Sequence, residues 1–342
     1  MPETVAAAPL LVVDRLSKHY IVGRHLFGGG GMALRAVDGI SFHIGRGETF
    51  GLVGESGCGK STAGKAILRL TEPTAGTVRL DGVEITALSR RPLHQQRRNM
   101  QAIFQDPYAS LNPKMTAAAI VNEPFINYRL HSPRERAERV AALFARVGLR
   151  PDQMQRYPHE FSGGQRQRLG IARALALEPK LVIGDEPVSA LDLSVQAQVI
   201  NLMVRLQEEL DLSYLFIAHD LAVVRHISDR IGVMYMGRIV EMAAAETVFA
   251  TPAHPYTRML LASVPSAGAR RGSRRRPVLR GEPPSPLAPP AGCPFPPRCP
   301  DAVARCRAEV PLLRLVGGGH LAACHLAGGD AVDATSGARA TG

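Results

Sequence analysis

The chain has 342 residues, of which 45% are hydrophobic, and its formal net charge is +11. This composition excludes wholesale disorder, because it supplies enough apolar side chains for a sizeable core. No stretch reaches the ~20 apolar residues that a membrane-spanning helix needs. The short apolar run near the start follows no basic leader, which argues against a secretory signal. We therefore expect a cytosolic protein that reaches any membrane through a partner.

Part of the positive charge is concentrated in five arginines between positions 270 and 276. Such a run is either a solvated linker or a segment attracted to anionic lipid or an acidic partner. The chain has no Trp and only 5% aromatic residues. Because a single-strand nucleic-acid binder needs interleaved stacking side chains, we predict no nucleic-acid partner.

The expected elements alternate between strands and helices along the chain. Helical segments are expected from the end of a glycine-rich turn to Leu70 and across 106–176, with Ser132-Pro133 as a helix start. The expected strands are 11–13, 40–44, 48–53, 181–184 and 214–218. The first two strands are separated by a glycine loop at 28–31. This alternation predicts a parallel sheet with helices on its faces.

The composition changes after about residue 265, where Arg, Pro and Gly predominate. The segment as far as 300 is expected to be a stiff linker or an irregular module. We predict three regions: a large folded domain at 9–250, an extension at 251–328 and a disordered tail at 329–342.

The strongest motif fits G-x-x-x-x-G-K-S between an expected strand and an expected helix, which is the P-loop context. Its glycines allow the backbone to wrap a phosphate, and the helix N-terminus adds a positive dipole end. Lys60 is expected to reach the β- and γ-phosphates, and Ser61 to bind Mg²⁺ through its hydroxyl. The residues expected to contact the nucleotide here are Gly54, Glu55, Ser56, Gly57, Cys58, Gly59, Lys60, Ser61 and Thr62.

Cys58 occupies a variable position of this loop at a helix N-terminus. That position favours a thiolate, so Cys58 is expected to be either a reactive thiol beside the phosphate site or an inert small side chain.

The second motif is an apolar strand that ends in Asp185 and Glu186, a Walker B pattern. Asp185 is expected to bind Mg²⁺ through water, and Glu186 to orient or deprotonate the attacking water. Acidic residues at strand ends are common on surfaces. The pattern gains weight here because it follows a P-loop.

Further motifs make the sequence resemble the ABC ATPases. Phe161 to Gln165 reads Phe-Ser-Gly-Gly-Gln, which is similar to the signature LSGGQ with Phe in place of the first Leu. The other matches are Gln105 for the Q-loop, Ser189 to Asp192 for the D-loop, His219 for the switch histidine and Tyr20 for the adenine-stacking aromatic. Tyr20 and His219 could equally be structural side chains if each stood alone.

The resemblance implies an ATP hydrolase in which two subunits pack head to tail. The signature of one subunit then completes the ATP site of the other, and Ser162 begins a helix whose amides form a second phosphate-binding tip. The residues implied on that side are Ser162, Gly163, Gly164, Gln165 and Asp192. The implied catalytic residues are Glu186, His219 and Gln105, and the implied Mg²⁺ ligands are Ser61, Gln105 and Asp185.

The finer resemblance is to the ATPases of oligopeptide and dipeptide importers, and among them to the second ATPase of the pair. It rests on 103–113, on Tyr157-Pro158-His159-Glu160 and on His254-Pro255-Tyr256-Thr257. It implies a second, paralogous ATPase, two membrane permeases and an extracytoplasmic substrate-binding protein, with this chain peripheral on the cytoplasmic face of the inner membrane. The cargo could instead be nickel, glutathione or another small solute. A soluble ABC ATPase outside transport is a further alternative.

The fold implied is a P-loop NTPase of the ABC type. It combines a RecA-like α/β core, an antiparallel β-subdomain, a helical subdomain at about 106–176 and a cysteine-containing C-terminal extension.

Four cysteines lie near the end of the chain: Cys293, Cys299, Cys306 and Cys324. In a cytosolic protein such a cluster favours a metal over disulfides. Its spacing matches neither a zinc ribbon nor a ferredoxin run, so zinc, with His320 or His325 as possible substitutes, and unligated thiols both stay open. The resemblance to related importer ATPases implies a [4Fe-4S] cluster, with Zn²⁺ as the alternative.

Overall fold

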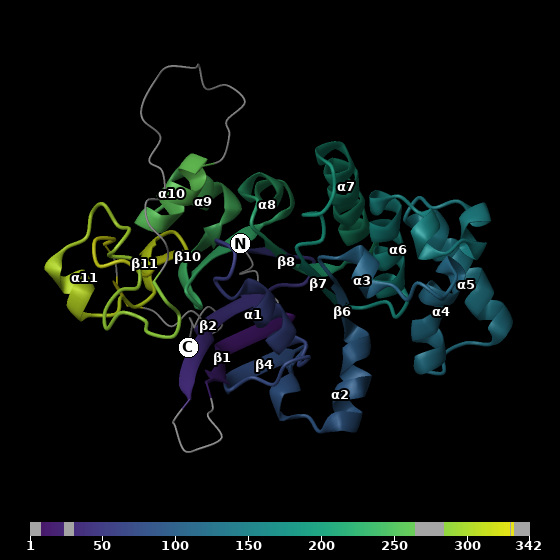
Figure 1. Cartoon of the computed structure of the whole chain (residues 1–342), viewed down its shortest axis with the longest axis horizontal. Coiled ribbons are helices and arrows are strands. Elements are labelled where there is room, and N and C mark those ends of the chain that lie inside the picture. Colours follow the sequence, from purple (N-terminus) through teal and green to yellow (C-terminus); the bar gives the residue numbers. More distant parts are fainter. Residues whose placement is uncertain (1–7, 24–30, 264–283, 329, 332–342) are drawn as a thin grey trace, which may run out of the picture. The chain divides into compact units, whose positions relative to one another are not determined.

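The computed structural model describes residues 8–23, 31–263, 284–328 and 330–331 (Figure 1). Most of the expected glycine loop, the arginine run and most of the expected linker and tail lie outside the described residues. The contacts divide the chain into two compact units. The first comprises 1–45, 49–87 and 219–342, and the second comprises 46–48 and 88–218. The predicted boundary after residue 250 stays a prediction.

The first unit contains an antiparallel sheet with the strand order β2-β1-β4-β5. Its strands are β1 (Leu11–Val22), β2 (Met32–Ile44), β4 (Ala75–Leu80) and β5 (Val83–Glu84), and the 3-10 helix η1 (Ile85–Ala87) follows. Leu11 and Val13 are buried two positions apart, as expected for a strand with one face on a core. The strands expected at 11–13 and 40–44 are confirmed as parts of longer strands.

A second set of strands in the first unit follows the order β13-β11-β12-β10-β9-β3. These are β3 (Thr49–Val53), β9 (Arg230–Tyr235), β10 (Arg238–Ala244), β11 (Arg314–Gly317), β12 (His320–Ala322) and β13 (Asp330–Ala331). β3 pairs parallel with β9, and the remaining pairs are antiparallel. The helices are α1 (Lys60–Ile67), α8 (Leu221–Ile227), α9 (Ala245–Ala250), α10 (Pro255–Ser263) and α11 (Ala304–Ala308).

The C-terminal extension is more regular than its composition suggests. Residues 284–303 form turns and irregular chain, as expected, but α11 and the strands β11 and β12 follow. β12 pairs with the edge of β10, where Glu241 faces Ala322 and Met242 faces Leu321. An unpaired strand edge offers backbone groups that a short segment can satisfy even when its own propensity is low.

The second unit has three parallel strands in the order β8-β7-β6. They are β6 (Met100–Ile103), β7 (Leu181–Asp185) and β8 (Ser213–Ala218), which confirms the two buried strands expected here. Its helices are α2 (Arg90–Gln96), α3 (Pro107–Ser110), α4 (Ala117–Asn127), α5 (Pro133–Arg146), α6 (Gly163–Leu175) and α7 (Leu193–Leu210). The 3-10 helices are η2 (Arg97–Asn99), η3 (Pro151–Gln155) and η4 (Pro158–Glu160).

The helix start expected at Ser132-Pro133 is confirmed. The Ser132 hydroxyl accepts a hydrogen bond from the Glu135 N–H, and the Glu135 carboxylate accepts one from the Ser132 N–H. This capping box satisfies two backbone donors that a helix start otherwise leaves open.

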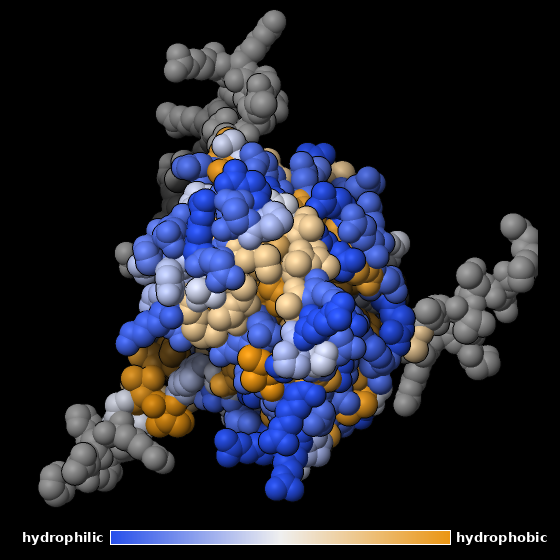
Figure 2. Space-filling model, turned by 90° about the vertical axis from the view of Figure 1, so that its right-hand side faces the viewer, coloured by the Kyte–Doolittle hydropathy of each residue, from blue (hydrophilic) through white to orange (hydrophobic). Residues whose placement is uncertain are grey.

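Hydrophilic side chains cover most of the face shown in Figure 2, and apolar side chains gather in patches between them. Large apolar side chains that the second unit exposes include Tyr108, which is 54% exposed, and Ile126. None of the described helices is both long and apolar enough to cross a membrane.

Candidate functional site

The P-loop runs from the end of β3 to the start of α1, as the motif predicted. Gly54, Gly57 and Gly59 have φ angles of 154°, 78° and 110°. A Cβ at Gly54 would lie 2.2 Å from the Met234 carbonyl oxygen, and one at Gly59 would lie 2.0 Å from the Ala36 carbonyl oxygen. Only glycine fits these two positions, so the backbone itself fixes the curve of the loop.

The loop closes around the side chain of Lys60, the first residue of α1. Its ammonium donates hydrogen bonds to the carbonyl oxygens of Gly54 at 2.7 Å and Glu55 at 3.0 Å. The residue before it, Gly59, has no side chain that could cap the first N–H groups of α1. A helix start of this kind, with a buried ammonium beside it, is a ready anion-binding site.

Cys58 does not match the expectation of an easily formed thiolate. Its side chain is 7% exposed, and burial raises the pKa of the thiol. The Lys60 ammonium, 3.8 Å from the sulfur, lowers that pKa but by less than burial raises it. Desolvation therefore outweighs the helix position on which the expectation rested.

In the second unit, Gln105 and Glu186 are brought together. The Gln105 side-chain amide donates to Glu186 Oε2 at 3.0 Å. Glu186 directly follows β7 and has a left-handed backbone with φ of 49°. The Glu186 N–H donates to the Ile217 carbonyl, and the Ser189 hydroxyl donates to the Glu186 carbonyl oxygen. These bonds hold the carboxylate at the end of a buried strand.

The signature residues form the start of α6, as expected. Ser162 is the N-cap, its hydroxyl accepts from the Gln165 N–H at 3.3 Å, and the Gln165 side chain accepts from the Ser162 N–H at 3.0 Å. Ser162 and Gly163 are exposed, whereas Gly164 is buried. A Cβ on Gly164 would lie 2.4 Å from a methyl carbon of Val195, so glycine allows α7 to approach.

The remaining predicted site residues are divided between the two units. Tyr20, the P-loop and His219 belong to the first unit, whereas Gln105, Asp185, Glu186, the signature and Asp192 belong to the second. Tyr20 is 37% exposed on β1, with the Lys18 ammonium 4.8 Å from its ring centroid. His219 is exposed directly after β8, and Asp192 is the N-cap of α7. The roles of these residues stay predictions.

The four C-terminal cysteines line one small cavity in the first unit, together with His254 and His325. Burial, and to a smaller extent the three other cysteines, raises the pKa of Cys293 to about 11. Across the part of the chain that is described, no group of three or more His, Cys, Asp or Glu side chains has the arrangement of a metal site.

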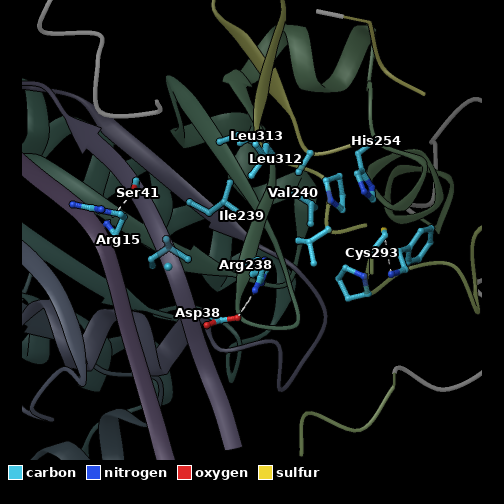
Figure 3. Close-up of a pocket in the computed structure, with 17 residues that line it drawn as sticks. Arg15, Asp38, Ser41, Arg238, Ile239, Val240, His254, Cys293, Leu312 and Leu313 are labelled. Carbon is cyan, nitrogen blue, oxygen red and sulfur yellow. Dashed lines mark hydrogen bonds and ion pairs between the residues drawn. The ribbon is translucent and has the colours of Figure 1, made fainter. Parts of the chain in front are cut away.

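A larger cavity of about 450 Å³ shares His254, Cys293 and Phe295 with the small one (Figure 3). Figure 3 shows the Asp38–Arg238 ion pair at one part of it and His254 and Cys293 at another. The Arg238 guanidinium lies 2.7 Å from Asp38, and the resulting hydrogen bonds and charge hold the pKa of Asp38 low against the opposing effect of burial. The apolar side chains of Ile239 and Val240, on β10, line the cavity between the ion pair and Cys293.

Sequence reasoning missed two residues that contact the P-loop at Glu55. The Tyr256 hydroxyl accepts from the Glu55 N–H at 2.9 Å, and the Arg298 guanidinium binds both carboxylate oxygens of Glu55. Tyr256 stands in the His-Pro-Tyr-Thr phrase that carried the importer resemblance, so that phrase was an available signal. Arg298 directly precedes Cys299 but carried no signal of a contact 243 residues away.

Two family descriptions match the chain. Residues 37–189 match "ABC transporter", and residues 240–306 match "Oligopeptide/dipeptide transporter, C-terminal region". The chain is 56% identical to the oligopeptide transport ATP-binding protein AppF of Bacillus subtilis, over 86% of this chain and 90% of that protein. It is 51% identical to a probable peptide ABC transporter ATP-binding protein of Sinorhizobium fredii, over 93% and 90% of the two chains.

Solved structures match the ATPase part of the chain. The dimeric post-hydrolysis state of the ATP-binding cassette MJ0796, bound to ADP and Pi, has 30% identity and a TM-score of 0.61, and covers 69% of this chain and 98% of that chain. The cbiO1 protein of Clostridium perfringens, part of a cbiONQ transporter complex, has 28% identity and a TM-score of 0.62, with 71% and 91% covered. These likenesses confirm the P-loop ABC ATPase fold. They also agree with an ATP-hydrolysing domain in a transporter subunit. The chain therefore belongs to the ATP-binding subunits of ABC transporters, in the oligopeptide/dipeptide transporter family.

Proposed function

We propose that this chain binds and hydrolyses ATP to power the import of oligopeptides or dipeptides. The observation that carries the ATP half is the P-loop, in which two sterically required glycines and the buried Lys60 form an anion site at the start of α1. The cargo half is supported by the C-terminal region match and by peptide-transport relatives above 50% identity. Nickel, glutathione or another small solute is the alternative cargo.

Within the site, each residue has a proposed role. Lys60 and the α1 amides neutralise the phosphates, and Tyr20 stacks on the adenine. Ser61, Gln105 and Asp185 supply the hard oxygen donors that Mg²⁺ prefers. Because the Gln105 amide nitrogen donates to Glu186, the amide oxygen is the atom that would face a cation. Mg²⁺ would neutralise charge on the transferred phosphoryl group.

Hydrolysis itself requires a positioned water. Glu186 accepts or orients the proton of that water, and its bonds to Gln105 and to the backbone after β7 hold it in place. His219 contacts the γ-phosphate and senses its loss. These roles are electrostatic positioning for in-line attack, with the chain's own groups arranged in advance.

We propose that the chain works as a head-to-tail pair with a paralogous ATPase. The start of α6 exposes Ser162 and Gly163, which gives it amides and a hydroxyl that a partner's nucleotide could reach. Next to the exposed Asp192, Leu193 is 81% exposed, so this start of α7 offers a partner an apolar side chain as well as a carboxylate.

The proposed membrane partners are two permeases, supplied by an extracytoplasmic binding protein. Tyr108, on α3 just after Gln105, is exposed, and the Arg166 guanidinium lies 5.0 Å from its ring centroid. An exposed aromatic with a cation beside it suits the surface of a protein partner. In this arrangement the chain lies on the cytoplasmic face of the inner membrane.

The four cysteines that line the small cavity supply a suitable set of donor atoms, because four thiols are enough for zinc or for a [4Fe-4S] cluster. We propose that Cys293, Cys299, Cys306 and Cys324 hold a [4Fe-4S] cluster, with Zn²⁺ as the second candidate.

The metal content tests this proposal. Protein purified without oxygen should be brown and contain about four iron and four sulfide per chain. Cys299→Ser should bleach it while ATP binding persists. Colourless protein with one zinc and no sulfide would select zinc instead.

Assembly provides the test of the proposed function. The purified chain should hydrolyse ATP slowly, and co-expression with its second ATPase and permeases should raise the rate strongly. The binding protein should then retain peptides rather than nickel or glutathione in a calorimetric titration. Full activity of a demonstrated monomer would reject the head-to-tail arrangement.

A further inference from the structure

The P-loop residue Glu55 is held by the C-terminal extension. The Arg298 guanidinium donates from both terminal nitrogens, each 2.7 Å from one oxygen of the Glu55 carboxylate. The Arg298 side chain is 3% exposed, whereas that of Glu55 is 27% exposed. A two-point bond between a guanidinium and a carboxylate fixes orientation as well as distance.

Arg298 is itself held in place by its surroundings. Its N–H donates to the Phe295 carbonyl at 3.0 Å, which closes a tight turn. Its guanidinium lies 5.9 Å from the ring centroid of Tyr235. Tyr235, Tyr256 and Phe295 pack against one another with centroids 4.6 to 5.5 Å apart, and all three are buried. Packing of this kind leaves the guanidinium few alternative positions.

A second connection reaches the backbone of the same residue. The Tyr256 hydroxyl accepts from the Glu55 N–H, and the Tyr256 N–H donates to His254 Nδ1 at 3.0 Å. The His254 N–H in turn donates to the buried carboxylate of Glu241, which His320 of β12 also contacts at 2.7 Å. The N–H of Glu55 is therefore bonded to Tyr256 and its carboxylate to Arg298, and both partners lie after residue 250 in the chain.

We propose that Arg298 is a positioning residue for ATP binding, which acts by neutralising and orienting Glu55. This inference rests on the proposed role of the P-loop as the triphosphate site. Glu55 is the second residue of a loop that has to receive an anionic triphosphate. An unpaired carboxylate there repels the phosphates and is free to turn toward them, whereas the Arg298 guanidinium compensates its charge and fixes its orientation.

The pair is one of three bonds that fix Glu55 within the P-loop, and two of the three come from Tyr256 and Arg298. The Lys60 ammonium holds the Glu55 carbonyl oxygen, Tyr256 holds the N–H and Arg298 holds the carboxylate. With three groups of one residue fixed, the loop enters binding with less conformational freedom to lose. A change that breaks the Arg298–Glu55 pair therefore weakens ATP binding without touching a nucleotide contact.

The test compares ATP affinities of the full chain by titration calorimetry in the presence of Mg²⁺. Arg298→Met keeps the buried volume but leaves Glu55 charged, and it should weaken ATP binding about tenfold. AMP, which carries fewer charges than ATP, should lose less. Adding Glu55→Gln to Arg298→Met removes the unpaired charge and should recover affinity to within about threefold of the starting protein.

Matched variants separate the possible outcomes. Arg258→Met breaks an exposed ion pair with Asp301 in the same unit and should leave ATP affinity unchanged. Arg298→Lys keeps the positive charge but loses the two-point bond, so its ATP affinity should be intermediate. This variant tests the inference if Arg298→Met does not fold. Unchanged affinity in Arg298→Met, or no recovery in the double variant, overturns the inference. Lys60→Ala should abolish binding, and if it does not, the P-loop assignment itself is wrong.

Discussion

The Gln105 side-chain amide donates a hydrogen bond of 3.0 Å to the Glu186 carboxylate, although the two residues are 81 positions apart in the sequence. Both were expected to be catalytic from separate motifs. Their contact within one unit places the Gln105 amide against the carboxylate that directly follows β7. A carboxylate held in this way keeps its orientation before a water arrives.

Replacing the carboxylate tests its role as the base. Glu186→Gln keeps the shape and can still accept from Gln105, but it cannot take a proton, so hydrolysis should fall ~10²–10⁴-fold. ATP affinity should stay within about twofold, because removal of a base leaves ground-state contacts in place. Glu209→Gln, on the exposed part of α7, is the control and should hydrolyse normally. A normal rate in Glu186→Gln would remove Glu186 from the mechanism.

Ser162 has a structural role as a helix cap and a proposed role at phosphate, and one variant separates them. Ser162→Asp supplies an equally good N-cap, so the stability of the chain should be kept, but its charge should repel a partner's ATP. Ser162→Ala should cost about 1 kcal/mol of stability through loss of the cap. ATPase rates of the assembled complex and thermal melts measure the two effects. A fully active Ser162→Asp complex would leave the hydroxyl with its capping role alone.

Cys58 should be a slow thiol, because the side chain is buried and burial raises its pKa. Alkylation by a small maleimide near pH 7.5 should be much slower than that of free cysteine, and unfolding in urea should restore the ordinary rate. Mass spectrometry of the P-loop peptide over time measures this. Fast labelling in the folded protein that ATP prevents would instead place the thiol at the nucleotide surface.

His254 should make folding stability depend on pH. Burial, assisted by Arg258, lowers its pKa to about 3, so the folded state keeps it neutral where the unfolded chain, with a pKa near 6.5, takes up a proton. The unfolded state binds more protons between these values, so stability falls as pH decreases through that window. The loss from pH 7 to pH 5 should be about 2 kcal/mol.

His254→Asn provides the comparison for that dependence. Its side-chain oxygen can still accept from the Tyr256 N–H but does not titrate in this range. Urea unfolding at pH 7 and pH 5 should therefore show a smaller loss in the variant. An equal loss in both proteins would assign the pH dependence to other groups.

The strands and helix starts that carry the predicted nucleotide motifs could be predicted because those motifs are local. The P-loop, Asp185-Glu186 and Ser162 each pair a short pattern with the strand end or helix start that it requires, and the structure has those elements where they were expected. The capping box likewise depends on only four consecutive residues, from Ser132 to Glu135.

Features that depend on burial or on distant pairing were not predictable from the sequence. The sequence left Cys58 open between a reactive thiol and an inert side chain, because the burial that raises its pKa cannot be read from its place at a helix start. β12 forms because the edge of β10 is there to receive it, and Arg298 matters because the fold brings it to Glu55. Neither pairing leaves a periodic signal in the chain.

The most direct test of the central claim is peptide uptake by vesicles that contain the complete complex. In these vesicles the interior takes the place of the cytoplasm. With the wild-type chain, ATP enclosed in the interior should drive accumulation of a labelled oligopeptide. Phosphate release should rise when binding protein and peptide are added outside. With Glu186→Gln, both accumulation and phosphate release should fall to the level of vesicles without ATP. ATP-dependent uptake that continues with the Glu186→Gln chain would contradict the account. So would a rate of phosphate release that does not change when peptide and binding protein are added.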